Sequence, residues 1–300
     1  MYFLLYSLFY LLSLLPLRIL YTVSDFGFFV IYTLIKYRRD VVADNLKFSF
    51  PEKTVEEREA IAKKFYKGLI DSMVETIKLF SISDKKLNKM FEIDFSLFNE
   101  LAPYQRRIQV QSAHQMNWEL GNVVFAKHAP IPWVGVYLKQ NNKTIDRILV
   151  KVRSSTGGVM IPAQEFRAKF RHLPFDHFIL TFVADQRPAV GESSYWLNFL
   201  NRPTPFFASL EKTAIRNDAI LVFVNTVKLK RGLYRFEPQL ITMNSSKMAP
   251  GEITLCYRDF LEKSIRQQPE NYLWSHRRWK MDFNPLLKKR WIDHTHPPLK

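Results

Sequence analysis

Residues 108–119 decide the fold, and they read Ile108-Gln109-Val110-Gln111-Ser112-Ala113-His114-Gln115-Met116-Asn117-Trp118-Glu119. The first part of this stretch contains the β-branched residues Ile108 and Val110, which are typical of a strand. Residues 117–127 then have the composition of a helix. The stretch therefore predicts a strand, a turn that contains His114, and a helix that contains Glu119.

The spacing of His114 and Glu119 indicates a catalytic pair. Five residues along a regular helix turn by about 140°, so the two side chains meet only if one of them lies outside the helix. A carboxylate that accepts the Nδ1 proton leaves Nε2 free to act as a base. We therefore predict His114 as the general base and Glu119 as the carboxylate that orients it. The alternative is a buried histidine beside a glutamate that only favours the positive end of a helix.

The wider pattern predicts an α/β fold. Strand-like runs lie at residues 108–111, 134–138, 178–184 and 220–227, and helical stretches lie at residues 117–127, 143–154 and 163–171. Their alternation predicts a mixed, mostly parallel sheet flanked by helices. Binding sites in such sheets form beyond the carboxyl ends of the strands, where His114 is expected.

A long amphipathic helix is expected before the first strand, within residues 51–80. Thr54 and Glu57 have the spacing of a capping box. An apolar stripe follows at helical intervals, formed by Ile61, Phe65, Leu69, Met73, Ile77 and Phe80. This helix is predicted to pack on the core.

Four further residues are candidates for substrate binding. Arg153 ends the helix at residues 143–154, and its guanidinium could hold a phosphate or a carbonyl oxygen. Asp185 and Gln186 follow the strand at residues 178–184, at the same edge of the sheet as His114. Backbone N–H groups near Asn117 could stabilise an oxyanion. The alternatives are a solvated cation at a helix end and an aspartate that favours a turn.

The segment Pro203-Thr204-Pro205-Phe206-Phe207 is expected to form a rigid loop. It would present aromatic side chains to an apolar ligand, or else pack on the core.

Residues 1–35 are predicted to be a hydrophobic membrane anchor, and residues 36–300 a single catalytic domain. The anchor is interrupted by Pro16, Arg18 and Asp25, which disfavour one uninterrupted span and favour two tilted or interfacial helices. A buried helical hairpin is the alternative. The basic cluster that follows, Lys36, Arg38 and Arg39, predicts that the domain lies on the cytoplasmic side.

The composition of the chain suits several kinds of acidic partner. The chain has 44 Lys and Arg against 28 Asp and Glu, a formal net charge of +16. This charge attracts anionic lipids, phosphorylated glycolipids, acidic carrier proteins or nucleic acid, and composition alone does not choose among them. No nucleic-acid-binding motif accompanies this charge, so a nucleic-acid partner is not expected. Cys256 is the single cysteine, which excludes an intramolecular disulfide. The histidines have no zinc spacing, and neither a metal nor a cofactor is expected.

Several segments together resemble a known family. They are Tyr37-Arg38-Arg39, Asn45-Leu46, Ser49-Phe50-Pro51-Glu52, His114 with Glu119, Asp185-Gln186, Pro205-Phe206-Phe207 and Pro269-Glu270-Asn271-Tyr272-Leu273-Trp274-Ser275-His276-Arg277-Arg278-Trp279-Lys280. In this order they resemble the bacterial late lipid A acyltransferases, a branch of the lysophospholipid and glycerolipid acyltransferases. The resemblance runs nearly from end to end.

The resemblance implies an enzyme of the bacterial inner membrane whose catalytic domain faces the cytoplasm. It would move a fatty acyl chain from acyl carrier protein to a hydroxyl of a lipid A precursor or related lipid, without a covalent enzyme intermediate. His114 and Glu119 would be the catalytic pair, and Arg153 would contact the substrate. Two alternatives stay open: transfer from acyl coenzyme A to a lysophospholipid or an aminolipid, and a non-enzymatic scaffold that binds anionic lipid.

Overall fold

The computed structural model describes residues 1–188 and 194–298. Its α-helices are α1 (Tyr2–Leu14), α2 (Leu17–Phe28), α3 (Arg39–Ser49), α4 (Val55–Lys78), α5 (Asp84–Met90), α6 (Ser96–Leu101), α7 (Trp118–His128), α8 (Lys143–Arg153), α9 (Phe166–Phe170), α10 (Ala208–Arg216) and α11 (Glu252–Gln267). Its strands are β1 (Phe91–Glu92), β2 (Ile108–Ser112), β3 (Trp133–Tyr137), β4 (Val159–Pro162), β5 (Ile179–Val183), β6 (Tyr195–Phe199), β7 (Arg202–Phe206), β8 (Ile220–Lys230) and β9 (Leu233–Thr242). A π-helix, η1 (Phe29–Leu34), continues α2, and short 3₁₀ segments include η3 (Ala163–Glu165) and η7 (Pro285–Arg290).

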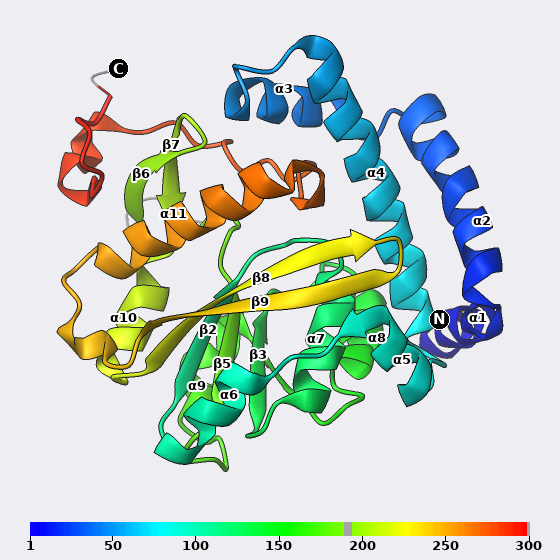
Figure 1. Cartoon of the computed structure of the whole chain (residues 1–300), viewed down its shortest axis with the longest axis horizontal. Helices are drawn as coiled ribbons and strands as arrows, with labels where there is room; N and C mark the ends of the chain where they lie inside the picture. The colour runs from blue at the N-terminus through cyan, green and yellow to red at the C-terminus, as the bar shows by residue number, and fades with distance from the viewer. Residues whose placement is uncertain (189–193, 299–300) are drawn as a thin grey trace.

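The predicted sheet is confirmed. Among the described residues, seven strands form one sheet in the order β1-β9-β8-β2-β5-β3-β4, and β6 pairs with β7 in a separate antiparallel ribbon. Neighbours in the large sheet are parallel except for β8 and β9 (Figure 1). The segment expected as a rigid loop at residues 203–207 instead lies mostly in β7.

Helices cover both faces of the sheet. On one face, Phe125 of α7 packs with its ring centroid 6.3 Å from that of Trp133 and 5.3 Å from that of Phe236. On the other face, the rings of Tyr257 and Phe260 in α11 lie 5.3 and 5.4 Å from Phe223 of β8. The strands are therefore buried on both sides, which explains their continuous apolar runs.

The long helix α4 begins at the predicted capping box. Thr54 Oγ1 accepts from the backbone N–H of Glu57 at 3.2 Å, and the Glu57 carboxylate accepts from the backbone N–H of Thr54 at 2.7 Å. The predicted apolar stripe is wrong at Met73, whose surface is 51% exposed. The helix buries polar side chains at that level instead, among them Asp71 and Glu75.

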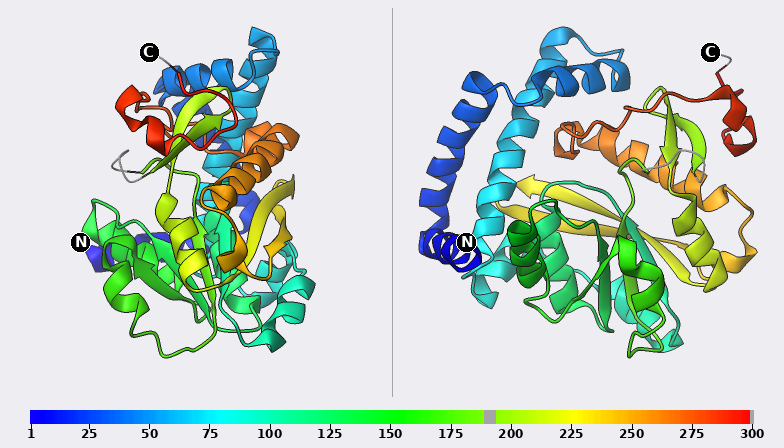
Figure 2. Two further views of the ribbon diagram at one scale, coloured as in Figure 1. Left: turned by 90° about the vertical axis from the view of Figure 1, so that its left-hand side faces the viewer. Right: turned by 180° about the vertical axis from the view of Figure 1, so that it is seen from behind.

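The N-terminal helices lie against α4. Figure 1 and the reverse view in Figure 2 both show α2 alongside α4, with α1 at a sharp angle to α2 after Pro16. Within the described chain, the helical segment Leu17–Leu34 is long and apolar enough to cross a membrane, and only 17% of it is buried. Length and composition alone do not distinguish a span from a surface helix.

A buried carboxylate caps α11. Glu211 of α10 is 1% exposed and accepts hydrogen bonds from the backbone N–H groups of Gly251 (2.6 Å) and Thr254 (3.0 Å) and from the Thr254 hydroxyl (2.8 Å). Gly251 is the N-cap residue of α11 and has no side chain that could accept these hydrogen bonds. Glu211 therefore joins α10 to the start of α11.

Replacement of Glu211 should destabilise the fold. We expect Glu211→Ala to lower the free energy of unfolding by about 3 kcal/mol, because it leaves buried donors without an acceptor. Glu252→Ala, at an exposed position in the same helix, is the control and should cost less than about 1 kcal/mol. Urea unfolding followed by circular dichroism measures both, and equal losses would contradict the capping role.

Candidate active site

The register of the sheet places His114 opposite Asp185. Ser112 of β2 pairs with Val183 of β5, and the Ala184 N–H donates to the Ser112 carbonyl at 2.8 Å. Two residues beyond these strand ends, His114 Nδ1 lies 2.7 Å from Asp185 Oδ1. The backbone N–H of His114 donates to the same oxygen at 3.0 Å. Two adjacent parallel strands thus deliver a base and a carboxylate to one edge of the sheet, as predicted for their positions.

The second ring nitrogen of His114 has the properties of a base. When Nδ1–H donates to Asp185, the neutral ring carries its lone pair on Nε2. The Gln186 amide nitrogen lies 3.2 Å from Nε2 and can donate to it. The side chain of His114 is 18% exposed, so this nitrogen lies close to the surface.

Asp185 is buried but stays charged. Burial alone would raise the pKa of its carboxyl group. The positive charge that His114 carries when it is protonated, its two hydrogen bonds to Asp185 and the charge of Arg278 together outweigh burial, so the pKa of Asp185 is lowered. A charged Asp185 stabilises the imidazolium that forms when Nε2 takes a proton.

The carboxylate that contacts the His114 ring is therefore Asp185, and the contact expected between His114 and Glu119 is not among the hydrogen bonds of the described residues. Glu119 lies in the first turn of α7, as expected, but its two oxygens accept from Arg153 Nε at 2.8 Å and Nη2 at 2.5 Å. Within the described residues, no hydrogen bond joins Glu119 to His114. The ring of Trp118 lies next to His114, with the centroids 5.3 Å apart, and its indole nitrogen donates to Glu119 at 3.2 Å.

Arg153, which was expected to bind substrate, forms an ion pair with Glu119. Its side chain and that of Glu119 are 12% and 11% exposed, so the ion pair is largely shielded from water. The bidentate geometry uses two of the five guanidinium N–H donors. The remaining donors leave Arg153 a candidate for substrate binding.

Asn117 has a structural role in addition to the one expected from the sequence. It is the N-cap of α7, and its Oδ1 accepts from the N–H groups of Glu119 at 3.1 Å and Leu120 at 3.2 Å. Its Nδ2 donates to Glu75 at 3.0 Å, and the residue is fully buried. The N–H groups of Glu119 and Leu120 therefore already donate to Asn117 within the protein.

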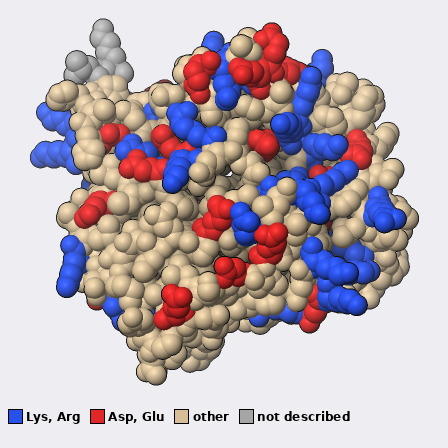
Figure 3. All heavy atoms as spheres, in the orientation of Figure 1, with Lys and Arg blue, Asp and Glu red and all other residues tan. Residues whose placement is uncertain are grey.

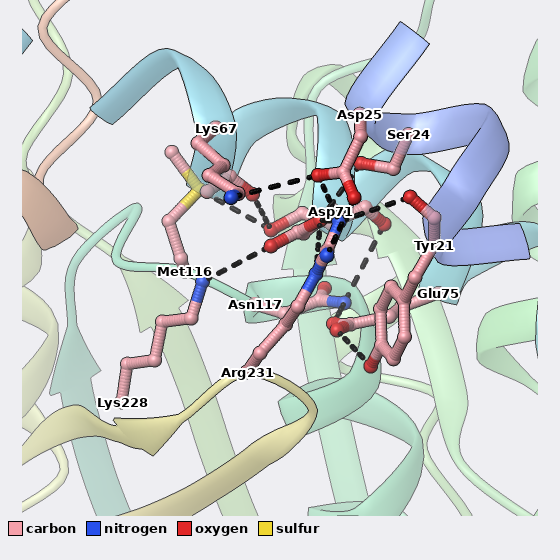
Figure 4. A network of polar contacts seen from close by, with 12 residues as sticks. Tyr21, Ser24, Asp25, Lys67, Asp71, Glu75, Met116, Asn117, Lys228 and Arg231 are labelled. Atoms are coloured by element: carbon pink, nitrogen blue, oxygen red, sulfur yellow. Dashed lines mark hydrogen bonds and ion pairs between the residues drawn. The ribbon is translucent and has the colours of Figure 1, made fainter. Parts of the chain in front are cut away.

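A buried polar network lies behind the start of α7 (Figure 4). Besides Asn117, the Glu75 carboxylate accepts from the hydroxyl groups of Tyr21 and Tyr234, each at 2.8 Å. Burial raises the pKa of Glu75. The sequence signal for this network was a polar stripe at helical spacing inside the apolar face of α4, formed by Asp71, Ser72, Glu75 and Lys78.

The C-terminal segment packs against the candidate site. The backbone N–H of Met116 donates to the Asn271 carbonyl at 3.0 Å, and Gln115 forms a β-bridge with Tyr272. The N-terminal part of the chain contacts the same segment, since Asn45 Nδ2 donates to the Trp274 carbonyl at 2.8 Å. The C-terminal segment thus contacts both the N-terminal part of the chain and the turn after His114.

A small pocket lies at this edge of the sheet. About 220 Å³ of space, part of it open to solvent, is lined by Gln111, Ala184, Phe206, Phe207, Leu210, Glu211, Thr254 and Tyr257. The part of this space that a water molecule can enter is only about 10 Å³, room for about one water, whereas a typical small-molecule site has about 300–1,000 Å³. The aromatic pair expected to meet an apolar ligand lines this pocket, and Phe206 also packs on the core, with its ring 5.4 Å from that of Phe199.

Comparison with known proteins agrees with the resemblance. The family model for the bacterial lipid A biosynthesis acyltransferases matches residues 1–281. The chain is 25% identical over 256 residues to the lipid A biosynthesis palmitoleoyltransferase of Escherichia coli K12, which covers 82% of the chain and 80% of that protein. It is 24% identical over 292 residues to the lipid A biosynthesis lauroyltransferase of the same organism, which covers 90% of the chain and 92% of that protein.

His276, in the C-terminal segment, should make stability depend on pH. Burial lowers its pKa to about 4 from an ordinary value of 6.5. Between these values the unfolded chain binds a proton that the folded chain does not, so stability falls as the pH drops from 6.5 to 4. We expect His276→Asn to reduce this fall, as measured by urea unfolding at stepped pH.

The matched control is His172→Asn, because His172 is exposed to solvent. This control should lose as much stability as the wild type when the pH drops from 6.5 to 4. A His276→Asn variant that loses as much as the wild type would contradict the role given to His276.

Proposed function

We propose a specific reaction for this chain, which belongs to the bacterial lipid A biosynthesis acyltransferase family and is an O-acyltransferase. It moves a fatty acyl chain from acyl carrier protein to a hydroxyl of a lipid A precursor, with His114 as the general base. The observation that carries the proposal is the pairing of His114 with Asp185. It leaves one basic nitrogen near the surface, at the carboxyl edge of the sheet. That edge is where ligands bind in parallel sheets.

The reaction needs one proton carrier. His114 Nε2 removes the proton from the acceptor hydroxyl as its oxygen attacks the thioester carbon of the donor. The tetrahedral intermediate collapses, the carbon–sulfur bond breaks, and the imidazolium returns the proton to the departing sulfur. The products are an ester and a free thiol on the carrier, and no covalent enzyme intermediate forms.

Polar groups near His114 have supporting roles. The Gln186 amide occupies Nε2 at 3.2 Å, so it must move when the acceptor hydroxyl binds, and it can then donate to the oxyanion. Arg153 is held by Glu119 and has donors left for a phosphate or carbonyl oxygen of the substrate. Glu119 thus acts through Arg153 and Trp118, with Asp185 as the orienting group.

Charge and apolar surface support the partners and the location. A formal net charge of +16 favours an acidic acyl carrier protein and anionic lipid. The apolar helices α1 and α2 favour association with the inner membrane, and the basic residues that follow them favour a domain on the cytoplasmic side.

Replacing the pair should remove catalysis while the fold persists. We expect His114→Ala to abolish acyl transfer and Asp185→Asn to lower kcat by roughly 10²-fold or more with little change in KM, because the ring loses its tautomer and orientation. The rates are measured in detergent with a lipid A precursor and acyl carrier protein that is loaded with a radiolabelled acyl chain. Asp176→Asn, an exposed carboxylate on the loop before β5, is the control and should behave as the wild type.

Glu119→Gln separates the two candidate carboxylates. If Asp185 orients His114, Glu119→Gln should raise KM more than it lowers kcat. Loss of kcat in Glu119→Gln with an unchanged kcat in Asp185→Asn would return the orienting role to Glu119. Faster transfer from acyl coenzyme A than from acyl carrier protein would overturn the proposed donor.

A further inference from the structure

Helix α1 is packed on the body of the protein. The rings of Tyr6 and Phe9 lie 5.4 and 5.8 Å from that of Phe80, just beyond α4. Arg147 of α8 lies over the ring of Tyr2, 4.3 Å from its centroid. Lys78 Nζ donates to the Leu15 carbonyl at 2.9 Å, at the end of α1. These contacts fix α1 across the ends of α4 and α8.

Helix α2 is fixed to α4 by polar contacts along its length. Tyr21 donates to Glu75, Ser24 donates to Asp71 at 2.7 Å, and the nearby π-helix contributes Tyr32, which donates to Glu59 at 2.7 Å. Figure 4 shows the first two of these contacts inside the buried network.

The turn after β8 adds a further link. Arg231 binds Asp25 Oδ1 at 2.9 Å and Asp71 at 2.6 Å, so one guanidinium joins α2 to α4 (Figure 4). Separation of α2 from α4 would take the Ser24 hydroxyl from Asp71 and the Tyr21 hydroxyl from Glu75, and both carboxylates are almost fully buried.

The outward sides of both helices are apolar. We call this surface the N-terminal apolar face, and its exposed residues are Phe3 (78%), Leu4 (74%), Leu8 (48%), Leu11 (63%), Ile19 (47%), Val23 (53%), Phe26 (68%) and Phe29 (49%). Many large apolar side chains exposed on two adjoining helices mark an interaction site.

A membrane-spanning α2 is inconsistent with these contacts. Because α2 lies alongside α4, hydrocarbon around α2 would also surround the exposed charges of α4, among them Lys63, Lys64 and Lys67. Burying charged side chains in hydrocarbon is costly. If α2 left α4 instead, Glu75 would lose the hydrogen bond from Tyr21 and Asp71 the one from Ser24, at a cost in free energy because both carboxylates are buried.

We propose that α1 and α2 lie in the plane of the membrane interface, with the N-terminal apolar face inserted into one leaflet and no segment crossing it. The occupant of this face is a surface of anionic lipid, because exposed basic residues adjoin it: Arg18, Lys36, Lys67 and Lys230. Figure 3 shows more Lys and Arg on the side where α2 and α4 lie than on the opposite side. Such helices bind through buried apolar area together with attraction to anionic lipid.

The topology test compares the two ends of the full-length chain. Epitope tags at the N- and C-termini are exposed to protease in sealed spheroplasts and in inverted membrane vesicles. In-plane helices predict that both tags are cut in the same preparation. Tags cut in opposite preparations would show a span and overturn the inference. This inference rests on the membrane association proposed above, and recovery of the chain in the soluble fraction would refute that association instead.

Vesicle binding tests the face itself. The purified full-length chain is mixed with sedimentable vesicles of phosphatidylethanolamine and phosphatidylglycerol. The double variant Leu11→Glu with Phe26→Glu should bind at least about tenfold more weakly, since two large apolar side chains no longer insert. Leu286→Glu, at an 87% exposed position in η7, is the control and should bind as the wild type. Equal binding of the double variant and the wild type would contradict the proposed face.

Discussion

The hydrogen bond between His114 Nδ1 and Asp185 is the interaction on which the candidate site depends. It exists because β2 and β5 are parallel neighbours in a register that ends both strands at the same level. A shift of one residue would turn either side chain to the other face of the sheet. The apolar residues of β2 and β5, buried against helices on both faces, hold this register, so the packing of the core and the orientation of the base have one cause.

The second constraint is the way in which α7 begins. Asn117 caps the helix and is itself held by Glu75, which also binds Tyr21 of α2. A chain of three polar contacts thus links a helix proposed to lie on the membrane with the helix that carries Glu119. The lipid substrate would reach the site from that membrane, so an anchor rigidly attached to the catalytic domain would keep the base at a fixed height above the lipid surface.

Much of the fold follows from the sequence because it is local or periodic. Continuous apolar runs predicted the central strands, and the capping box predicted the start of α4. The position of His114 at a strand end was predicted for the same reason. The partner of His114 was not, because a carboxylate five residues away and one 71 residues away are equally compatible with the pattern until the strand order is known. Met73 was misjudged because polar contacts from distant segments, α2 and the β8–β9 turn, determine which side of α4 is buried.

The central claim is that Asp185 fixes the tautomer of His114, and nitrogen NMR tests it most directly. Protein with ¹⁵N-labelled histidine has seven imidazole side chains, and a His114→Gln sample identifies the signals of residue 114. At neutral pH we predict a protonated Nδ1 and an unprotonated Nε2 for His114, with this pattern lost in Asp185→Asn and retained in Glu119→Gln. A His114 ring protonated on Nε2, or a pattern that disappears only in Glu119→Gln, would contradict the account.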